Sequence, residues 1–97
     1  MAKGKFIIIH PKDNVATALV AADAGDTINI AAEGQSDIQI KLVDSILSGH
    51  KVAVQPITKG QSIIKYGYEI GKATKDILPG EYVHIHNVES TRGRGDL

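Results

Sequence analysis

Two histidines near the carboxyl end of the chain have the spacing that most directly suggests chemistry. His84 and His86 lie two positions apart in a segment that alternates apolar and polar residues, which predicts a strand. Val83 and Ile85 would then face the core, whereas Tyr82, His84 and His86 would share the other face, with the imidazoles about 6.5–7 Å apart. Two rings at that spacing can converge on one metal ion or one anionic ligand. The alternative is a pair of surface histidines, since a protein metal site usually has a third ligand.

A second group of polar residues lies where the first apolar strand meets the segment that follows it. His10 ends that strand, and Asp13 and Asn14 come shortly after it. Backbone N–H groups at a strand-to-helix junction point outward and can hold a carboxylate, so these residues are candidates for an anion site. The alternative is that His10 only ends the strand and that Asp13 or Asn14 only caps the helix.

Three further positions carry groups that could bind or react. Lys65 and Tyr66 lie at the end of a strand, where a lysine can bind a carboxylate, act as a base or simply lie in solvent. Asn87 places an amide beside the two histidines. His50 begins a later strand and faces opposite to Lys51, and we assign it a structural role.

The elements that position these residues are mostly strands. Fourteen Ile and seven Val against five Leu make the apolar set β-branched, which is typical of strands. Alternation and short apolar runs predict strands over 5–10, 27–30, 37–42, 50–54, 62–66 and 82–88, with a hairpin turn at 33–35. A helix is predicted over 13–24, because apolar residues recur there at helical spacing and Gly25 follows as a C-cap. The segment 69–77 fits a helix or a strand, 44–49 fits one helical turn, 89–97 reads as a flexible tail, and no internal repeat is apparent.

Composition excludes several classes of protein. The 97 residues fit one domain, and eleven basic residues balance eleven acidic ones, so no broad positive field exists for nucleic acid or an anionic membrane. Without cysteine there is no disulfide scaffold, no thiol chemistry and no cysteine-ligated metal. The chain shows neither an apolar run of membrane-spanning length nor a signal-peptide pattern, so we expect a cytoplasmic protein.

Six segments taken together resemble a known family. They are HPKDNVATAL at 10–19, GHKVAV at 49–54, ITKG at 57–60, IKYG at 64–67, IGKAT at 70–74 and GEYVHIHN at 80–87. In this order and spacing they resemble the amino-terminal SAF domain of the altronate dehydratase and galactarate dehydratase family. The resemblance implies a β-clip fold, mainly β with one or two short helices, forming a single domain over 1–88.

The same resemblance implies a set of site residues. The candidate catalytic residues are His10, Lys65, His84 and His86, and the candidate substrate-binding residues are Asp13, Asn14, Tyr66 and Asn87. It also implies a divalent metal, Fe(II) or Mn(II), that would be shared with a large subunit, and His84 and His86 are its candidate ligands in this chain.

The function implied by the resemblance is that of a lyase subunit. The main expectation is the small subunit of a metal-dependent hydro-lyase that dehydrates a sugar acid such as altronate and is inactive without a separate large catalytic subunit. The alternative within this class is the small subunit of (2R)-sulfolactate sulfo-lyase, which releases sulfite instead of water. An alternative of another class is a stand-alone SAF module that binds a small acid or a protein without catalysis.

Overall fold

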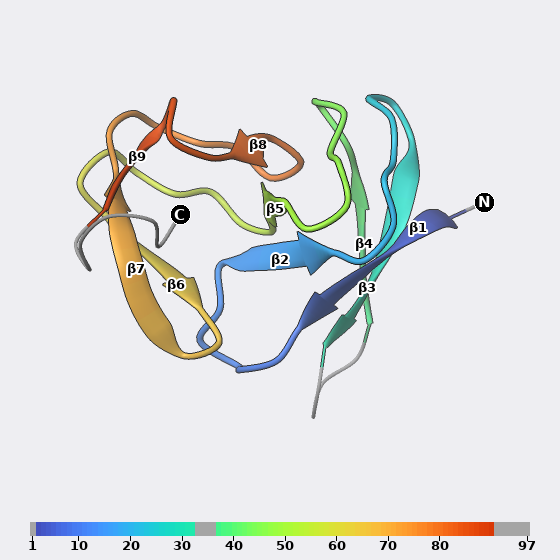
Figure 1. Cartoon of the computed structure of the whole chain (residues 1–97), viewed down its shortest axis with the longest axis horizontal. Helices are drawn as coiled ribbons and strands as arrows, with labels where there is room; N and C mark the ends of the chain where they lie inside the picture. The colour runs from blue at the N-terminus through green and yellow to red at the C-terminus, as the bar shows by residue number, and fades with distance from the viewer. Residues whose placement is uncertain (1, 33–36, 91–97) are drawn as a thin grey trace.

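The chain folds into a larger and a smaller sheet, in which most neighbouring strands are antiparallel (Figure 1). The computed structural model describes residues 2–32 and 37–90, and within them it contains nine strands and no helix. The larger sheet has the order β4-β3-β1-β2-β5-β8, made of β1 (Ala2–Ile8), β2 (Val15–Ala18), β3 (Thr27–Ala32), β4 (Ile38–Lys41), β5 (Lys51–Ala53) and β8 (Tyr82–Val83). The smaller sheet has the order β6-β7-β9, made of β6 (Ser62–Lys65), β7 (Tyr68–Ala73) and β9 (Val88–Ser90). The mainly β fold class is confirmed.

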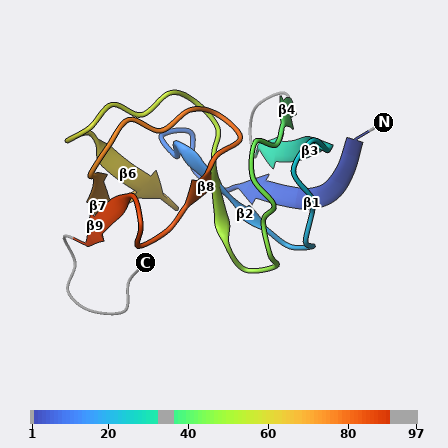
Figure 2. The ribbon, with the colours of Figure 1, turned by 90° about the horizontal axis from the view of Figure 1, so that it is seen from above.

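The smaller sheet lies at one end of the molecule, and strands β1, β3 and β4 of the larger sheet lie at the other. The remaining strands of the larger sheet, β2, β5 and β8, lie between them. Figures 1 and 2 both show β6, β7 and β9 on one side and β1, β3 and β4 on the other. Within the large sheet β1 pairs parallel with β3, and the other pairings are antiparallel. Strands β2, β5 and β8 therefore meet apolar side chains on both of their faces.

The predicted helix over 13–24 is wrong, because its apolar residues form strand β2. All four residues of β2 are buried, and the strand pairs with β1 on one side and β5 on the other. A short strand covered on both faces has no period-two signal, and the residues beyond it completed a helical spacing by coincidence. Leu19, which a helix would have buried, is 50% exposed. The segment 44–49 likewise forms no helical turn.

Gly25, expected as a helix cap, instead belongs to a turn that recurs four times. Each copy places an apolar residue of an isolated β-bridge three positions before a glycine and a fully buried residue three positions after it. The bridge residues are Ala22, Ile46, Ile57 and Ile77, the glycines are Gly25, Gly49, Gly60 and Gly80, and the buried residues are Ile28, Val52, Ile63 and Val83. Each glycine has φ between 85° and 91°, as the third residue of a type II turn requires. The repeat escaped the sequence analysis because only three of its seven positions are constrained.

Alternation along the central strands divides the apolar side chains between two cores. Ala16, Val52 and Tyr82 face the core of the large sheet, which also holds Phe6 and Ile30. Val15, Ala53 and Val83 face the second core, between the central strands and the small sheet, together with Ile57, Ile63, Ile70, Ala73, Ile77 and Val88. Val52 points from one face of β5 into the core of the large sheet. The other face of β5 is thus directed toward β6 and β7.

The predicted strand over 82–88 is correct only at its two ends. It consists of β8, a turn over 84–87, and β9, so Ile85 is 69% exposed and does not face the core, whereas Val83 is fully buried. The turn is closed by the backbone of Asn87, whose N–H donates to the carbonyl of His84 at 3.1 Å. The strand β9 continues through Ser90, so 89–90 belong to the sheet, while 91–97 of the expected tail lie outside the described residues.

The remaining strand predictions agree with the structure. Strands occur within or overlapping 5–10, 27–30, 37–42, 50–54 and 62–66, and β3 and β4 form the expected antiparallel pair. The predicted turn at 33–35 lies outside the described residues. The undecided segment 69–77 contains most of β7. The described chain includes no helix of the length and hydropathy needed to cross a membrane.

Candidate functional site

A buried lysine lies in the middle of the central strands. Thr17 of β2, Lys51 of β5 and Val83 of β8 are in register, so their side chains share the face that is directed toward the small sheet. Lys51 is only 4% exposed, and within the described residues its ammonium has neither an ion pair nor a hydrogen bond. A lysine in this situation is unusual, because a buried charge is normally paired.

The β6–β7 turn lies against the polar end of this row. Lys65 and Tyr68 pair across a two-residue loop, and both loop residues have positive φ, 55° at Tyr66 and 82° at Gly67, as a type I′ hairpin turn requires. The Tyr66 hydroxyl donates to Oγ1 of Thr17 at 3.5 Å, and Lys65 Nζ lies 4.9 Å from the Tyr66 ring centroid. A tyrosine at such a φ is a backbone outlier, and residues held in this way cluster at functional sites.

Four aromatic rings gather around Tyr82 of β8, the strand that pairs with β5. The ring centroid of Tyr82 lies 5.5 Å from that of His50, 5.4 Å from that of His84 and 5.3 Å from that of His86, and the His50 and His84 centroids are 5.3 Å apart. Nδ1 of His50 is 2.6 Å from the Tyr82 hydroxyl. His84 and His86 therefore do lie beside Tyr82, as the sequence predicted, but through a turn after Val83 rather than along one strand. His50 joins them, which the sequence did not predict.

Electrostatics distinguish Lys51 and His84 from the other basic residues. Burial, and secondarily repulsion by Lys65, lowers the pKa of the Lys51 amine. Burial also lowers the pKa of His84, with smaller contributions from the positive charges of Lys51, His50 and His86. Nδ1 of His84 is buried and has no hydrogen-bond partner in the described residues. The region around Lys51, Lys65 and His84 therefore combines positive charge with a buried ring nitrogen that makes no hydrogen bond.

The His50 side chain departs from the pattern of the repeated turn. In the other three turns the last residue, Asp26, Gln61 or Glu81, uses a side-chain oxygen to accept from the first N–H of its own turn, at 2.7–3.0 Å. His50 occupies the same position but directs its ring to Tyr82 instead. The structural role assigned to His50 from sequence therefore does not describe its side chain, which belongs to the aromatic group.

The first predicted group, around His10, lies directly behind the β6–β7 turn. Oδ1 of Asp13 accepts from the Gly67 N–H at 2.8 Å, and its Oδ2 accepts from the N–H groups of Ile9 and His10 at 3.3 and 3.2 Å. A β-carbon on Gly67 would lie 2.8 Å from Cδ2 of His10, so the imidazole packs against the turn itself. Asp13 and His10 thus hold the backbone that presents Lys65 and Tyr66.

The two candidate asparagines bind backbone groups. Asn14 donates to the carbonyl of Ser62 and accepts from the N–H of Ile64, both at 2.8 Å, which links β2 to β6. Asn87 donates to the Tyr82 carbonyl at 2.8 Å and accepts from the His84 N–H at 2.9 Å. Asn14 and Asn87 therefore have structural contacts in this chain, and substrate binding by them or by Asp13 stays a prediction.

Sequence reasoning missed Lys51 and the role of His50. A signal was present: Lys51 stands directly before the apolar run Val52–Val54, although its neighbours in space come from β2, β6 and the turn after β8. Metal binding stays a prediction as well. Among residues 2–32 and 37–90, no three histidine, cysteine, aspartate or glutamate side chains are grouped to hold a metal ion.

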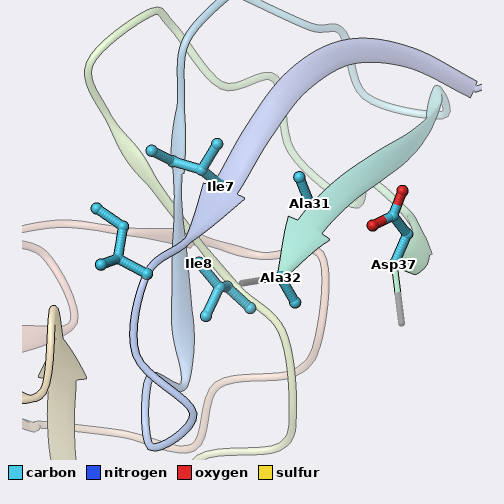
Figure 3. A pocket seen from close by; sticks show the side chains of 6 residues that line it. Ile7, Ile8, Ala31, Ala32 and Asp37 are labelled. Atoms are coloured by element: carbon cyan, nitrogen blue, oxygen red, sulfur yellow. The ribbon is translucent and has the colours of Figure 1, made fainter. Parts of the chain in front are cut away.

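Two of the surface pockets formed by the described residues differ in how they relate to this group. One, of about 410 Å³, is lined by Ile7, Ile8, Ile9, Ala31, Ala32 and Asp37 at the ends of β1 and β3 (Figure 3). It includes none of the candidate residues. The other, of about 350 Å³, is polar and is lined in part by Asp44, Tyr82 and His86. The aromatic group therefore has one wall open to a polar pocket on the side of His86.

Comparison with known proteins identifies the family. The family model described as the altronate/galactarate dehydratase SAF domain matches residues 4–91. The chain belongs to this SAF domain family. Altronate dehydratase of Bacillus subtilis is 42% identical over 85 residues, which cover 88% of this chain and 16% of that protein. Altronate dehydratase of Escherichia coli is 40% identical over 86 residues, which cover 89% of this chain and 16% of that protein.

A further relative is matched over nearly its whole length. The (2R)-sulfolactate sulfo-lyase subunit alpha of Chromohalobacter salexigens is 31% identical over 88 residues, which cover 88% of this chain and 94% of that protein. The SAF domain described here thus spans about a sixth of the altronate dehydratases that it matches, and almost all of this sulfo-lyase subunit.

Proposed function

We propose that this chain is the small subunit of a two-subunit lyase that acts on an anionic hydroxy acid. The observation that carries the proposal is the near end-to-end match to a protein that is itself named as one subunit of a sulfo-lyase. The basic group formed by Lys51, Lys65 and His84 supports it, because the substrates named for the relatives are acids.

Between the two lyase reactions, the match over 94% of the sulfo-lyase subunit favours (2R)-sulfolactate sulfo-lyase. In that reaction a base removes the proton next to the carboxylate, and the group that leaves from the neighbouring carbon is sulfite. The second candidate is altronate dehydratase, in which the leaving group is water, and the higher identity of 42% supports it. In both cases negative charge accumulates on the carboxylate during proton removal, so positive groups near that carboxylate lower the barrier.

The site described here is incomplete for either reaction, and we propose that a large subunit supplies the rest. His84 would contribute an imidazole whose lowered pKa keeps it neutral near neutral pH. The Fe(II) or Mn(II) suggested by the family resemblance would be shared between the subunits, with His84 and His86 as its ligands from this chain. When bound, such an ion stabilises charge on a carboxylate oxygen.

The test is to capture the partner and assay the complex. The tagged chain is expressed in its own cells, and the purified complex is assayed for sulfite release from (2R)-sulfolactate and for the 2-keto-3-deoxy acid formed from altronate. We expect turnover of one of the two acids. His84→Gln should lower kcat/KM at least tenfold, whereas Lys72→Gln, at an exposed position of β7, should stay within twofold.

Two results would refute the proposal. One is a purified complex that turns over neither acid with iron or manganese added. The other is a chain that associates with no large dehydratase-like protein, which would favour a stand-alone SAF module that binds a small acid or a protein without catalysis.

A further inference from the structure

We propose that Lys51, Lys65 and His84 form a binding site for the carboxylate of a hydroxy acid, with Lys51 as its principal charge. The inference takes from the proposed function only the class of acid. The site itself is argued from the position of Lys51 between the sheets, from the missing counter-charge, and from the turn that borders it.

The position of Lys51 follows from the register of the central strands. Ala53, two residues further along β5, faces the second core and is fully buried, so the Lys51 side chain extends along the same face, toward the small sheet. Thr17 lies beside it on β2 and is 9% exposed. The side-chain stem of Lys51 is therefore packed at the end of an apolar core, which restricts the directions that its ammonium can take.

The missing counter-charge indicates a ligand rather than an internal pair. Lys65 interacts electrostatically with Lys51, and this interaction is between like charges. Within the described residues, Lys51 has no carboxylate partner, and Nδ1 of His84 has no hydrogen-bond partner. Removing cations from water without pairing them is unfavourable, and an anion that binds among them removes that cost while forming charge-assisted hydrogen bonds.

The β6–β7 turn gives the site a fixed wall that carries hydroxyl groups. Tyr66 contacts Thr17 through its hydroxyl, so two hydroxyl groups lie next to the row that contains Lys51. The bond from Gly67 to Asp13 and the contact of Gly67 with His10 hold the turn from behind. A wall held in place before the ligand arrives loses little entropy on binding. The adjacent hydroxyls fit an acid that bears hydroxyl groups near its carboxylate.

The experiment is an NMR titration of the full ¹⁵N-labelled chain with sodium gluconate, a soluble sugar acid. Sorbitol is the ligand control, because it has the same carbon chain with an alcohol in place of the carboxylate, and sodium acetate provides a carboxylate without hydroxyls. We expect gluconate to shift the amide signals of Lys51, Lys65, Tyr66 and His84. Sorbitol should not shift them, and acetate should bind at least threefold more weakly than gluconate.

Variants separate this site from nonspecific attraction. Lys51→Met should weaken gluconate binding at least tenfold, since a hydrogen bond to a charged group contributes roughly 1.5–3 kcal/mol. Lys72→Met removes an equal charge at an exposed position and should bind as the wild type does. Lys65→Met should weaken gluconate binding by a smaller factor than Lys51→Met. Because Lys65 lies at the β6–β7 turn and not in the buried row, this variant tests the site even if Lys51→Met fails to fold.

The outcomes distinguish this inference from the proposed function. It is overturned if Lys51→Met binds gluconate as tightly as the wild type, if sorbitol shifts the same signals, or if gluconate shifts none of them at 100 mM, an upper limit of about 1.4 kcal/mol of binding. Acetate binding as tightly as gluconate overturns the assignment to a hydroxy acid. The proposed function fails separately, if the complex with the large subunit turns over neither acid while gluconate binding by this chain is intact.

Discussion

Lys51→Met is expected to make the isolated chain more stable, although it removes a proposed ligand-binding group. The Lys51 residue is only 4% exposed, and its ammonium has no partner in the described structure that would be left unpaired by its removal. Methionine fills the same space with an unbranched apolar side chain. Replacing a buried charge by an apolar group of similar volume typically stabilises a protein by about 1–4 kcal/mol when the charge is poorly compensated.

The assay is thermal and urea unfolding followed by circular dichroism, in a buffer without carboxylate or phosphate that could occupy the site. In a domain of this size, each kcal/mol corresponds to roughly 4–8 °C in Tm, so Lys51→Met should raise Tm by at least about 4 °C at pH 7. Lys72→Met, at an exposed position, should change stability by no more than about 0.5 kcal/mol.

The pH dependence gives an independent check with a definite sign. Burial lowers the pKa of folded Lys51 below the value in the unfolded chain, about 10.4. Between these two values the unfolded chain binds more protons than the folded one, so the wild type gains stability as pH rises. The advantage of Lys51→Met should therefore be largest below the lowered pKa and shrink as pH approaches 10.4. A variant less stable than the wild type, or an advantage that does not change with pH, would refute the reasoning.

Three further predictions concern the turns that shape the site, and unfolding measurements test all of them. Val83→Ala should cost roughly 1–3 kcal/mol and Ile85→Ala no more than about 0.5, because only Val83 is buried, and the reverse order would contradict the turn over 84–87. Tyr66→Asn should stabilise the chain by about 0.5–1 kcal/mol, because Asn-Gly is the preferred type I′ pair, and a loss would mean that the phenol contacts outweigh the backbone cost. Gly80→Ala should cost at least about 1 kcal/mol more than Gly25→Ala, because both glycines have positive φ but only at Gly80 would the new methyl collide with a backbone carbonyl, and equal losses would refute this.

The success of sequence reasoning on the fold depended on how each strand is covered. β3 and β4 were predictable because they alternate, with Ile28 and Ile30 buried and their neighbours partly exposed. β2 was not, since burial of all four residues removes the alternation and leaves only spacing, which also fits a helix. Its partners β1 and β5 are identified only by long-range pairing, which no local pattern contains.

For the candidate site, the sequence predicted several of the residues but not their geometry. His84 and His86 do gather around Tyr82, yet a strand was predicted where a turn is present, because no glycine or proline interrupts 81–88. Asn87 was the available signal, since asparagine side chains commonly bond to nearby backbone groups in turns. The position of Lys51 before the apolar run Val52–Val54 was a local signal, but its significance comes from neighbours on other strands, which no local pattern contains.

The distribution of satisfied and unsatisfied polar groups separates scaffold from site more sharply than residue type does. Asp13, Asn14 and Asn87 are buried polar residues, and each uses its side chain to bind backbone groups. Lys51 is a buried residue without an ion pair or hydrogen bond in the described structure, Nδ1 of His84 is buried without a hydrogen-bond partner, and Tyr66 has an unfavourable backbone conformation. Each of these three features costs stability, and they are linked in space: Lys51 interacts electrostatically with His84, and its strand neighbour Thr17 accepts a hydrogen bond from Tyr66. The whole stability of a chain of this size is expected to be small. Strained or unpaired groups that had no function would have no reason to be neighbours. Their proximity is therefore what we expect of a site that binds a ligand or is completed by a second subunit.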